Sequence, residues 1–316
     1  MANESTLLLA KQYSRNQHIE SIPQKDSNLP VALEYIYNSV WEENADDAPY
    51  ETITQIMDCY YCLPERPDLA ALFCWQALNH SYNEFLLSDS SVNNITDKAG
   101  IEKLIEGIES HYVEYKEYLL PYLDALPDKA YRYVSSYLLK GYVFERAGES
   151  PKYITQSYKS FKKDYPVLFD VISKTFGDIL YKGSHVAIRN NQARTFADKG
   201  KSRKLVRELG LRLQNLVKNK KADFLMEDKT IQEIQFSDRE VITFVIRYIL
   251  YASRCSNFHG NVASRLNSDN AEEKTYEMYT NIFLLEYMLL GISLHMQGYL
   301  SDECLERLKA NKDLLM

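Results

Sequence analysis

The feature that most constrains this chain is the helix expected from about Ala271 to Met296, near its end. Its apolar run, from Ile282 to Met296, is too short to cross a lipid bilayer and contains Glu286 and His295. A helix that is apolar on most sides must be covered by other parts of the protein. The stretch therefore predicts a buried helix in a helical core.

The rest of the chain has the periodicity of helices, and few segments alternate in the way that strands do. The predicted fold class is all-α. We expect helices from Pro30 to Trp41 and over residues 50–62, 68–87, 98–119, 130–147, 154–165, 166–181, 202–220 and 301–314, in addition to the buried helix. Pro121 and Pro127 predict a break. Residues 42–49 read as an acidic linker, residues 185–201 as a loop or interrupted helix, and residues 224–236 as a linker with a possible short strand or turn.

The helix expected from Asp68 to Leu87 is another strong helical pattern. Its predicted core side consists of Leu69, Leu72, Phe73, Ala77, Tyr82 and Phe85. Trp75 and His80 fall elsewhere on the helix. We interpret His80 as a packed or surface histidine, with membership of a site as the alternative.

Charge is distributed unevenly along the sequence. The whole chain has a net charge of −7, yet residues 182–221 contain 12 Lys and Arg against 2 Asp and Glu. Within this segment, Arg203, Lys204 and Arg207 fall on the outer side of the helix expected over residues 202–220. The basic face predicts either a solvated surface or a surface that contacts phosphates.

Another strongly patterned helix follows Ser237, which forms a capping box with Glu240. It leads to the sequence RCSNFHG, which contains Arg254, Asn257 and His259. A guanidinium can stabilise the charge of a phosphodiester transition state, and an imidazole can transfer a proton near neutral pH. On an ideal helix these two side chains point about 140° apart. Either Gly260 ends or kinks the helix, or a second copy of the chain completes the pair.

RCSNFHG resembles the nuclease motif of HEPN domains, in which an arginine is followed after four to six residues by a histidine and often a glycine. The segment RPDLAALFCWQALNHSYNEF, from Arg66 to Phe85, is similar to the first core helix of several HEPN subfamilies. The apolar helix after the motif also fits that family. The resemblance implies a HEPN-like helical bundle over residues 66–316, with a helical extension over residues 1–65 and an insertion or second subdomain over residues 88–236.

The function that this resemblance implies is metal-independent endoribonuclease activity, in a homodimer and in a defence or toxin context. Arg254 and His259 would be catalytic, and Asn257 would orient the histidine or bind phosphate. Arg265, in the polar loop after the motif, is a further RNA-binding candidate. RNA is the expected partner, and an antitoxin or activator protein is a possible one.

Two other functions stay open. Many catalytic HEPN members carry a polar residue directly after the arginine, whereas this chain has Cys255. That difference favours a non-catalytic, dimeric module that binds RNA or nucleotides. The basic helix also permits a DNA-binding regulator, although no partner helix for a helix-turn-helix precedes it.

Five cysteines and no visible signal peptide predict reduced thiols in the cytoplasm. Cys59 and Cys62 form a lone CxxC pair, which we interpret as helix-buried thiols. The sequence lacks a glycine-rich phosphate loop, paired metal-ligand histidines and a GxSxG elbow. We therefore expect no cofactor, no metal and no membrane association.

Overall fold

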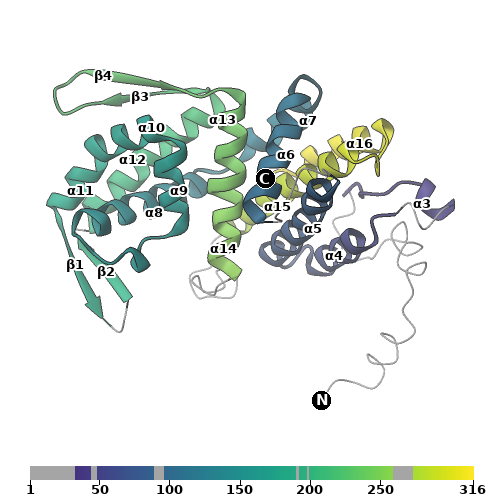
Figure 1. The fold of residues 1–316 in the computed structure, drawn as a ribbon, viewed down its shortest axis with the longest axis horizontal. Helices are drawn as coiled ribbons and strands as arrows, with labels where there is room; N and C mark the ends of the chain where they lie inside the picture. Colours follow the sequence, from purple (N-terminus) through teal and green to yellow (C-terminus); the bar gives the residue numbers. More distant parts are fainter. Residues whose placement is uncertain (1–32, 44–47, 89–95, 190–191, 198, 259–272) are drawn as a thin grey trace, which may run out of the picture. The chain divides into compact units, whose positions relative to one another are not determined.

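The computed structural model describes residues 33–43, 48–88, 96–189, 192–197, 199–258 and 273–316 (Figure 1). The chain separates into two compact units. The first comprises Met1–Ala125 and Gly260–Met316, so it is assembled from both ends of the chain. The second, Leu126–His259, is continuous.

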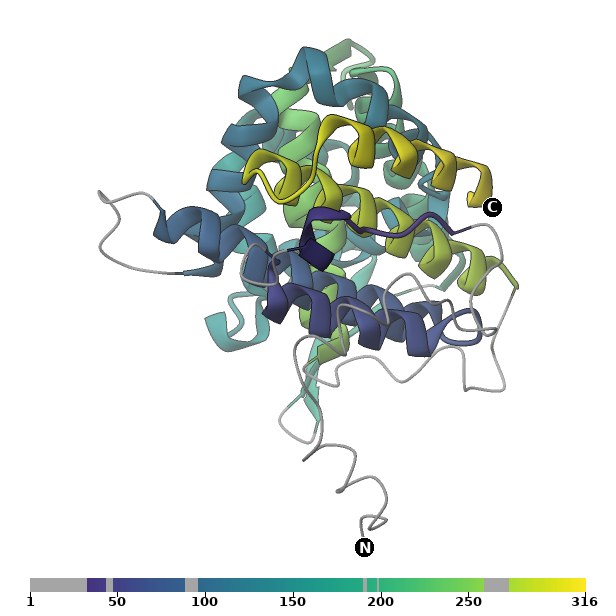
Figure 2. The same ribbon diagram turned by 90° about the vertical axis from the view of Figure 1, so that its right-hand side faces the viewer.

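The first unit is built around the long helix α15 (Glu273–Met296). Its other described helices are α3 (Val40–Glu43), α4 (Tyr50–Cys62), α5 (Pro67–Leu87), α6 (Asp97–Ser110), α7 (Tyr112–Ala125), α16 (Asp302–Leu308) and the 3₁₀ helix η5 (Lys309–Leu314). α15 packs against α5, α7 and α16, while α5 also contacts α4 and α6. Figure 2 shows the yellow C-terminal helices lying beside the purple N-terminal helices of this unit.

The prediction of a buried helix near the end of the chain is confirmed by α15. Every residue from Asn281 to Leu294 is buried. Polar groups on this helix are paired across the core: the Tyr287 hydroxyl lies 2.5 Å from that of Tyr60, and the Ser293 hydroxyl lies 2.7 Å from that of Ser81. These bonds offset the cost of burying hydroxyls in an apolar core.

The second unit is organised around α8 (Asp128–Arg146), which packs against α12 (Lys199–Lys218) and against the π-helical segment η4 (Phe244–Tyr251). Its remaining described elements are the 3₁₀ helix η2 (Pro151–Tyr153), α9 (Gln156–Asp164), α10 (Pro166–Ile172), the π-helical η3 (Ser173–Gly177), α11 (Asp178–Lys182), α13 (Asp238–Thr243), α14 (Ala252–Phe258) and four strands. Phe161, Tyr165, Phe244 and Tyr248 form a cluster of aromatic rings in its core.

The all-α fold class is confirmed, with two small hairpins added. β1 (Ser184–Arg189) pairs with β2 (Gln192–Ala197), and β3 (Lys221–Leu225) pairs with β4 (Ile231–Gln235), both antiparallel. The prediction of a loop or interrupted helix over residues 185–201 was therefore wrong over the first hairpin. A two-stranded ribbon is stabilised by backbone hydrogen bonds between its strands. These bonds do not depend on particular side chains, so the sequence pattern predicts such a hairpin poorly.

The prediction of a helix from Pro30 to Trp41 was wrong for most of the residues in this range that the structure describes. Only α3 is helical there, while residues 33–38 have no regular structure. Their backbone is held by side chains from distant helices: the Ile36 N–H donates to the Tyr287 hydroxyl at 2.7 Å, and the Glu34 N–H donates to Asn311 Oδ1 at 2.7 Å. Tertiary hydrogen bonds here replace those of a local helix.

The single helix predicted over residues 98–119 is divided into α6 and α7 at His111, and Pro121 lies inside α7 without ending it. The predicted core side of α5 was also partly wrong. Trp75 is fully buried, whereas Leu69, Leu72, Phe73 and Phe85 are only partly buried. Because α5 is apolar on several sides, its buried face is decided by the helices that contact it.

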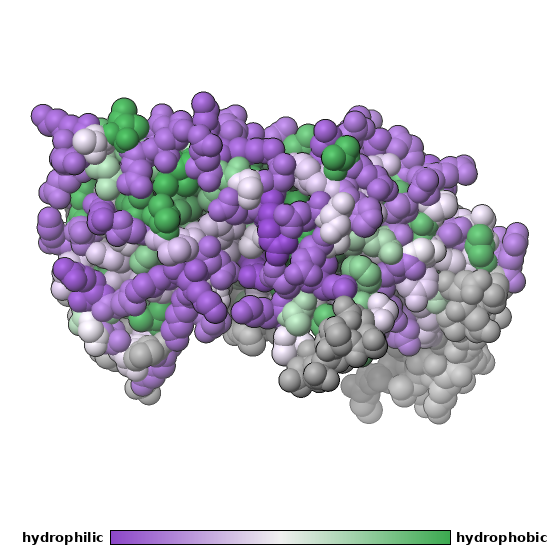
Figure 3. Space-filling view, turned by 45° about the horizontal axis from the view of Figure 1, so that its top comes forward, coloured by the Kyte–Doolittle hydropathy of each residue, from purple (hydrophilic) through white to green (hydrophobic). Residues whose placement is uncertain are grey.

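No helix among the described residues is both long enough and apolar enough to cross a membrane. On the face shown in Figure 3, hydrophilic residues predominate and the apolar residues form small separate groups. Scattered exposed apolar side chains are normal for a folded protein.

Candidate active site on the motif helix

The motif helix, as we name the continuous helical run from Asp238 to Phe258, comprises α13, η4 and α14. Its predicted capping box is confirmed. The Ser237 Oγ accepts a hydrogen bond from the Glu240 N–H at 3.2 Å, and the Glu240 carboxylate accepts one from the Ser237 N–H at 2.8 Å. This reciprocal pair fixes where the helix begins.

The middle of the motif helix, η4, is wound as a π-helix and is largely buried. Two tyrosines of α8 donate hydrogen bonds to its carbonyl groups and to the start of α14. The Tyr137 hydroxyl donates to the Tyr248 carbonyl at 3.3 Å, and the Tyr133 hydroxyl donates to the Ala252 carbonyl at 2.9 Å. Burial raises the pKa of Tyr137, which keeps this hydroxyl a donor. The two bonds hold the backbone in place just before Arg254.

Arg247 lies seven residues before Arg254 on the motif helix and has a structural role. Its Nη1 atom lies 3.0 Å from Asp164 of α9, and the Tyr248 hydroxyl donates to the same carboxylate at 2.6 Å. Burial and this bond raise the pKa of Tyr248. Asp164 thus ties α9 to the motif helix.

Arg254 lies in α14, and its side chain is partly buried, as is that of Cys255. The helix continues for four residues beyond Arg254, to Phe258. Asn257 belongs to α14, but its side chain, together with His259 and Arg265, lies outside the part of the chain that the structure describes. Of the predicted site residues Arg254, Asn257 and His259, the structure therefore places the side chain of Arg254 alone.

The basic helix α12 has a buried apolar side and an exposed basic side, as predicted. Leu205, Leu209, Leu213, Leu216 and Val217 are buried, while Arg203, Lys204 and Arg207 are exposed. The Lys204 ammonium lies 3.8 Å from Glu208, a weak surface pair. α8 packs against both α12 and η4, so it contacts the basic helix as well as the motif helix.

The two cysteines of the CxxC pair lie in α4 and are both free thiols. Cys59 is fully buried and donates to the Gln55 carbonyl at 3.3 Å, while Cys62 is partly buried. Burial raises the pKa of both thiols, which disfavours the reactive thiolate. The interpretation of Cys59 as a helix-buried thiol is confirmed.

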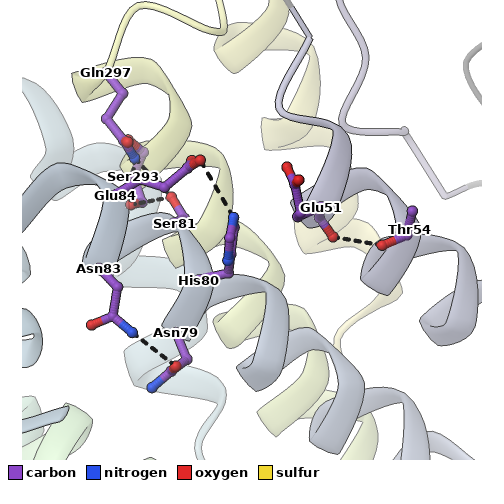
Figure 4. Close-up of polar contacts among 9 residues, drawn as sticks. All are labelled: Glu51, Thr54, Asn79, His80, Ser81, Asn83, Glu84, Ser293 and Gln297. Atoms are coloured by element: carbon purple, nitrogen blue, oxygen red, sulfur yellow. Dashed lines mark hydrogen bonds and ion pairs between the residues drawn. The ribbon is translucent and has the colours of Figure 1, made fainter. Parts of the chain in front are cut away.

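One group of side chains in the first unit was missed by the sequence reasoning. Glu51 of α4 lies close to His80 and Glu84 of α5 (Figure 4), and one ligand atom from each lies within 4.8 Å of the others. His80 and Glu84 are separated by one helical turn, which is the one signal visible in the sequence. The contribution of Glu51 depends on how α4 packs against α5.

No protein-family model, curated protein or solved structure matches this chain. The class of the protein is therefore defined by its fold alone, as an all-α protein whose described residues include two β-hairpins.

Proposed function

We propose that the chain is a metal-independent endoribonuclease of the HEPN type. The observation that carries the proposal is the position of Arg254. It lies near the end of a capped helix whose backbone is fixed by the Tyr133 and Tyr137 hydroxyls, and its side chain is only partly buried. A guanidinium held on a rigid element is suited to stabilising charge on a phosphate.

In the proposed reaction the 2′-oxygen of RNA attacks the adjacent phosphorus while His259 accepts the 2′-hydroxyl proton. Arg254 stabilises the negative charge of the pentavalent transition state. The bond to the 5′-oxygen then breaks, and that oxygen takes up a proton from a general acid. The products are a 2′,3′-cyclic phosphate and a 5′-hydroxyl, and no metal takes part. Asn257 orients His259 or binds a phosphate oxygen.

The helical course of α14 supports a site shared between two copies of the chain. α14 is regular from Arg254 to Phe258. If the helix continued by one residue, Arg254 and His259 would point about 140° apart and would not meet within one copy. A two-fold homodimer brings the arginine of one copy to the histidine of the other.

The exposed residues Arg203, Lys204 and Arg207 of α12 support RNA binding as a second, non-catalytic contact. These residues would hold the RNA backbone, while Arg254 would act at the cleaved bond. Arg265 would bind RNA nearer to the motif. The activity would belong to the cytoplasm, in a defence or toxin context, where an antitoxin or activator protein would restrain or trigger it.

The first test is incubation of the purified chain with end-labelled tRNA and total RNA, with and without EDTA. We expect cleavage in both conditions, leaving cyclic phosphate ends. His259→Ala and Arg254→Ala should each reduce the rate by at least about 100-fold. The control, His111→Ala, replaces an exposed histidine in the first unit and should cleave normally. Cleavage that persists in His259→Ala would contradict the proposal.

The shared site has a test of its own. Mixing Arg254→Ala with His259→Ala forms mixed dimers in which one of the two sites has both residues intact. We expect activity to return in the mixture, whereas each variant alone stays inactive. No recovery, under conditions where subunits exchange, would place both residues in one copy.

The second candidate function is a non-catalytic, HEPN-like module that binds RNA or nucleotides. It is favoured by Cys255, which is partly buried directly after Arg254, where many catalytic members have a polar residue. Binding and cleavage assays with the same RNA distinguish the two functions. Binding without cleavage, by wild type and by His259→Ala equally, would support the module.

A further inference from the structure

The group formed by Glu51, His80 and Glu84 joins two neighbouring helices of the first unit. His80 and Glu84 lie one turn apart on α5, and Glu51 lies at the start of α4, which packs against α5. One ligand atom from each side chain lies within 4.8 Å of the others. Figure 4 shows the three side chains directed towards the same space between the two helices.

The distance between the side chains of His80 and Glu84 matches the distance between two ligands of one metal ion. His80 Nε2 lies 3.4 Å from Glu84 Oε1, but neither His80 Nε2 nor Glu84 Oε2 has a hydrogen-bond partner among the described residues. Ligands that lie 2.0–2.1 Å from a tetrahedral Zn²⁺ are separated by about 3.3–3.4 Å. By distance the contact is an ion pair within one helical turn, but it is not a hydrogen bond, and its length is close to the spacing of neighbouring metal ligands.

The burial of individual ligand atoms is a second observation in favour of a metal ion. Although both side chains are 32% exposed, the Nε2 atom of His80 and the Oε2 atom of Glu84 are themselves buried. On α4, one turn after Glu51, the Oε1 atom of Gln55 is also buried and has no hydrogen-bond partner in the described part of the chain. Buried polar atoms without partners cost free energy, and a bound cation with its water would satisfy them.

We propose that Glu51, His80 and Glu84 bind a divalent transition-metal ion, with Zn²⁺ as the best fit. An imidazole with two carboxylates suits Zn²⁺ better than Mg²⁺, which prefers oxygen ligands. Three protein ligands leave a fourth position for water. The ion clamps α4 to α5 and stabilises the first unit. It takes no part in RNA cleavage, so the proposal is independent of the ribonuclease.

The test is isothermal titration of ZnCl₂ into the full-length chain after removal of metals with EDTA and desalting. We expect one high-affinity equivalent and an unfolding temperature that rises by several degrees when Zn²⁺ is added. Glu51→Gln changes an exposed side chain and leaves the fold intact, so its binding should weaken at least tenfold. His80→Ala should weaken binding at least as strongly.

The matched control is the double variant Glu106→Gln with His111→Ala, which removes one exposed glutamate and one exposed histidine elsewhere in the first unit. It should bind Zn²⁺ as tightly as wild type. Co²⁺ in place of Zn²⁺ should give a visible spectrum without a thiolate-to-metal charge-transfer band, since no cysteine is a ligand. The proposal is overturned if wild type binds no Zn²⁺, if Glu51→Gln and His80→Ala bind normally, or if the cobalt spectrum shows thiolate ligands.

Discussion

At the scale of single residues, Glu286 is a carboxyl group buried in the core of the first unit. It lies in the middle of α15, is 2% exposed, and its Oε2 atom has no hydrogen-bond partner among the described residues. Burial raises the pKa of this carboxyl well above its ordinary value, and the neighbouring Cys74 adds to the effect. The folded chain therefore holds the Glu286 proton at a pH where the unfolded chain has released it.

This environment gives Glu286 a predictable effect on stability. Below the ordinary pKa of a glutamate both states are protonated, so the residue has no pH-dependent effect. As the pH rises, the unfolded chain loses the proton first, and stability falls. Glu286→Gln cannot ionise, so we expect its free energy of unfolding to exceed that of wild type by about 1–3 kcal/mol near pH 8, with a smaller difference near pH 5.

Urea unfolding of both proteins at the two pH values measures this difference. Glu106→Gln, which neutralises an exposed glutamate of the same unit, is the control and should behave as wild type at both. An equal effect of Glu286→Gln at both pH values would mean that Glu286 is not protonated in the folded chain.

At the scale of elements, the motif helix depends on how its first turn is capped. The four leading N–H groups of a helix have no partner within the helix, and Ser237 with Glu240 forms the capping box at this end. We expect Ser237→Ala to lower the free energy of unfolding of the second unit by about 1 kcal/mol. Because the same helix carries Arg254, the variant should also reduce RNA cleavage more than its small loss of stability explains.

Thermal unfolding followed by circular dichroism measures the stability change, and the cleavage assay measures the functional one. Ser110→Ala is a suitable control, because Ser110 is exposed and donates to the Glu106 carbonyl at the end of α6, where it caps no N–H group. Unchanged stability in Ser237→Ala would show that solvent replaces the capping box.

At the scale of the whole molecule, the unequal distribution of charge predicts how RNA binding responds to salt. The chain is acidic overall, yet Arg203, Lys204 and Arg207 project from one exposed helix face. Each phosphate contact releases bound counterions, so affinity falls as salt rises. We expect replacement of all three residues by Gln to reduce the slope of log affinity against log salt by about 2 for single-stranded RNA.

The control for this prediction removes the same number of positive charges from another part of the second unit. Lys152, Lys159 and Lys163 are all exposed, and their replacement by Gln should leave the slope unchanged. Filter binding of labelled RNA over a series of salt concentrations measures both slopes. Equal slopes for the two triple variants would mean that RNA contacts the chain elsewhere.

Local sequence determined the helical character of this protein, because helix formation depends on residues three and four apart. The buried leucine side of α12 and the capping box at Ser237 could both be predicted from spacing alone. The burial of α15 could also be predicted, since a stretch that is apolar on most sides has to be covered.

Tertiary structure decided what depends on contacts between distant segments. It buried Trp75 rather than Phe73, held the backbone of residues 33–38 by hydrogen bonds to other helices, wound η4 as a π-helix, and brought Glu51 to His80 and Glu84. None of these follows from the local sequence, because the free energy of each depends on which neighbours the packed helices supply. The sequence alone therefore predicted most of the helices, whereas packing decided which side chains meet.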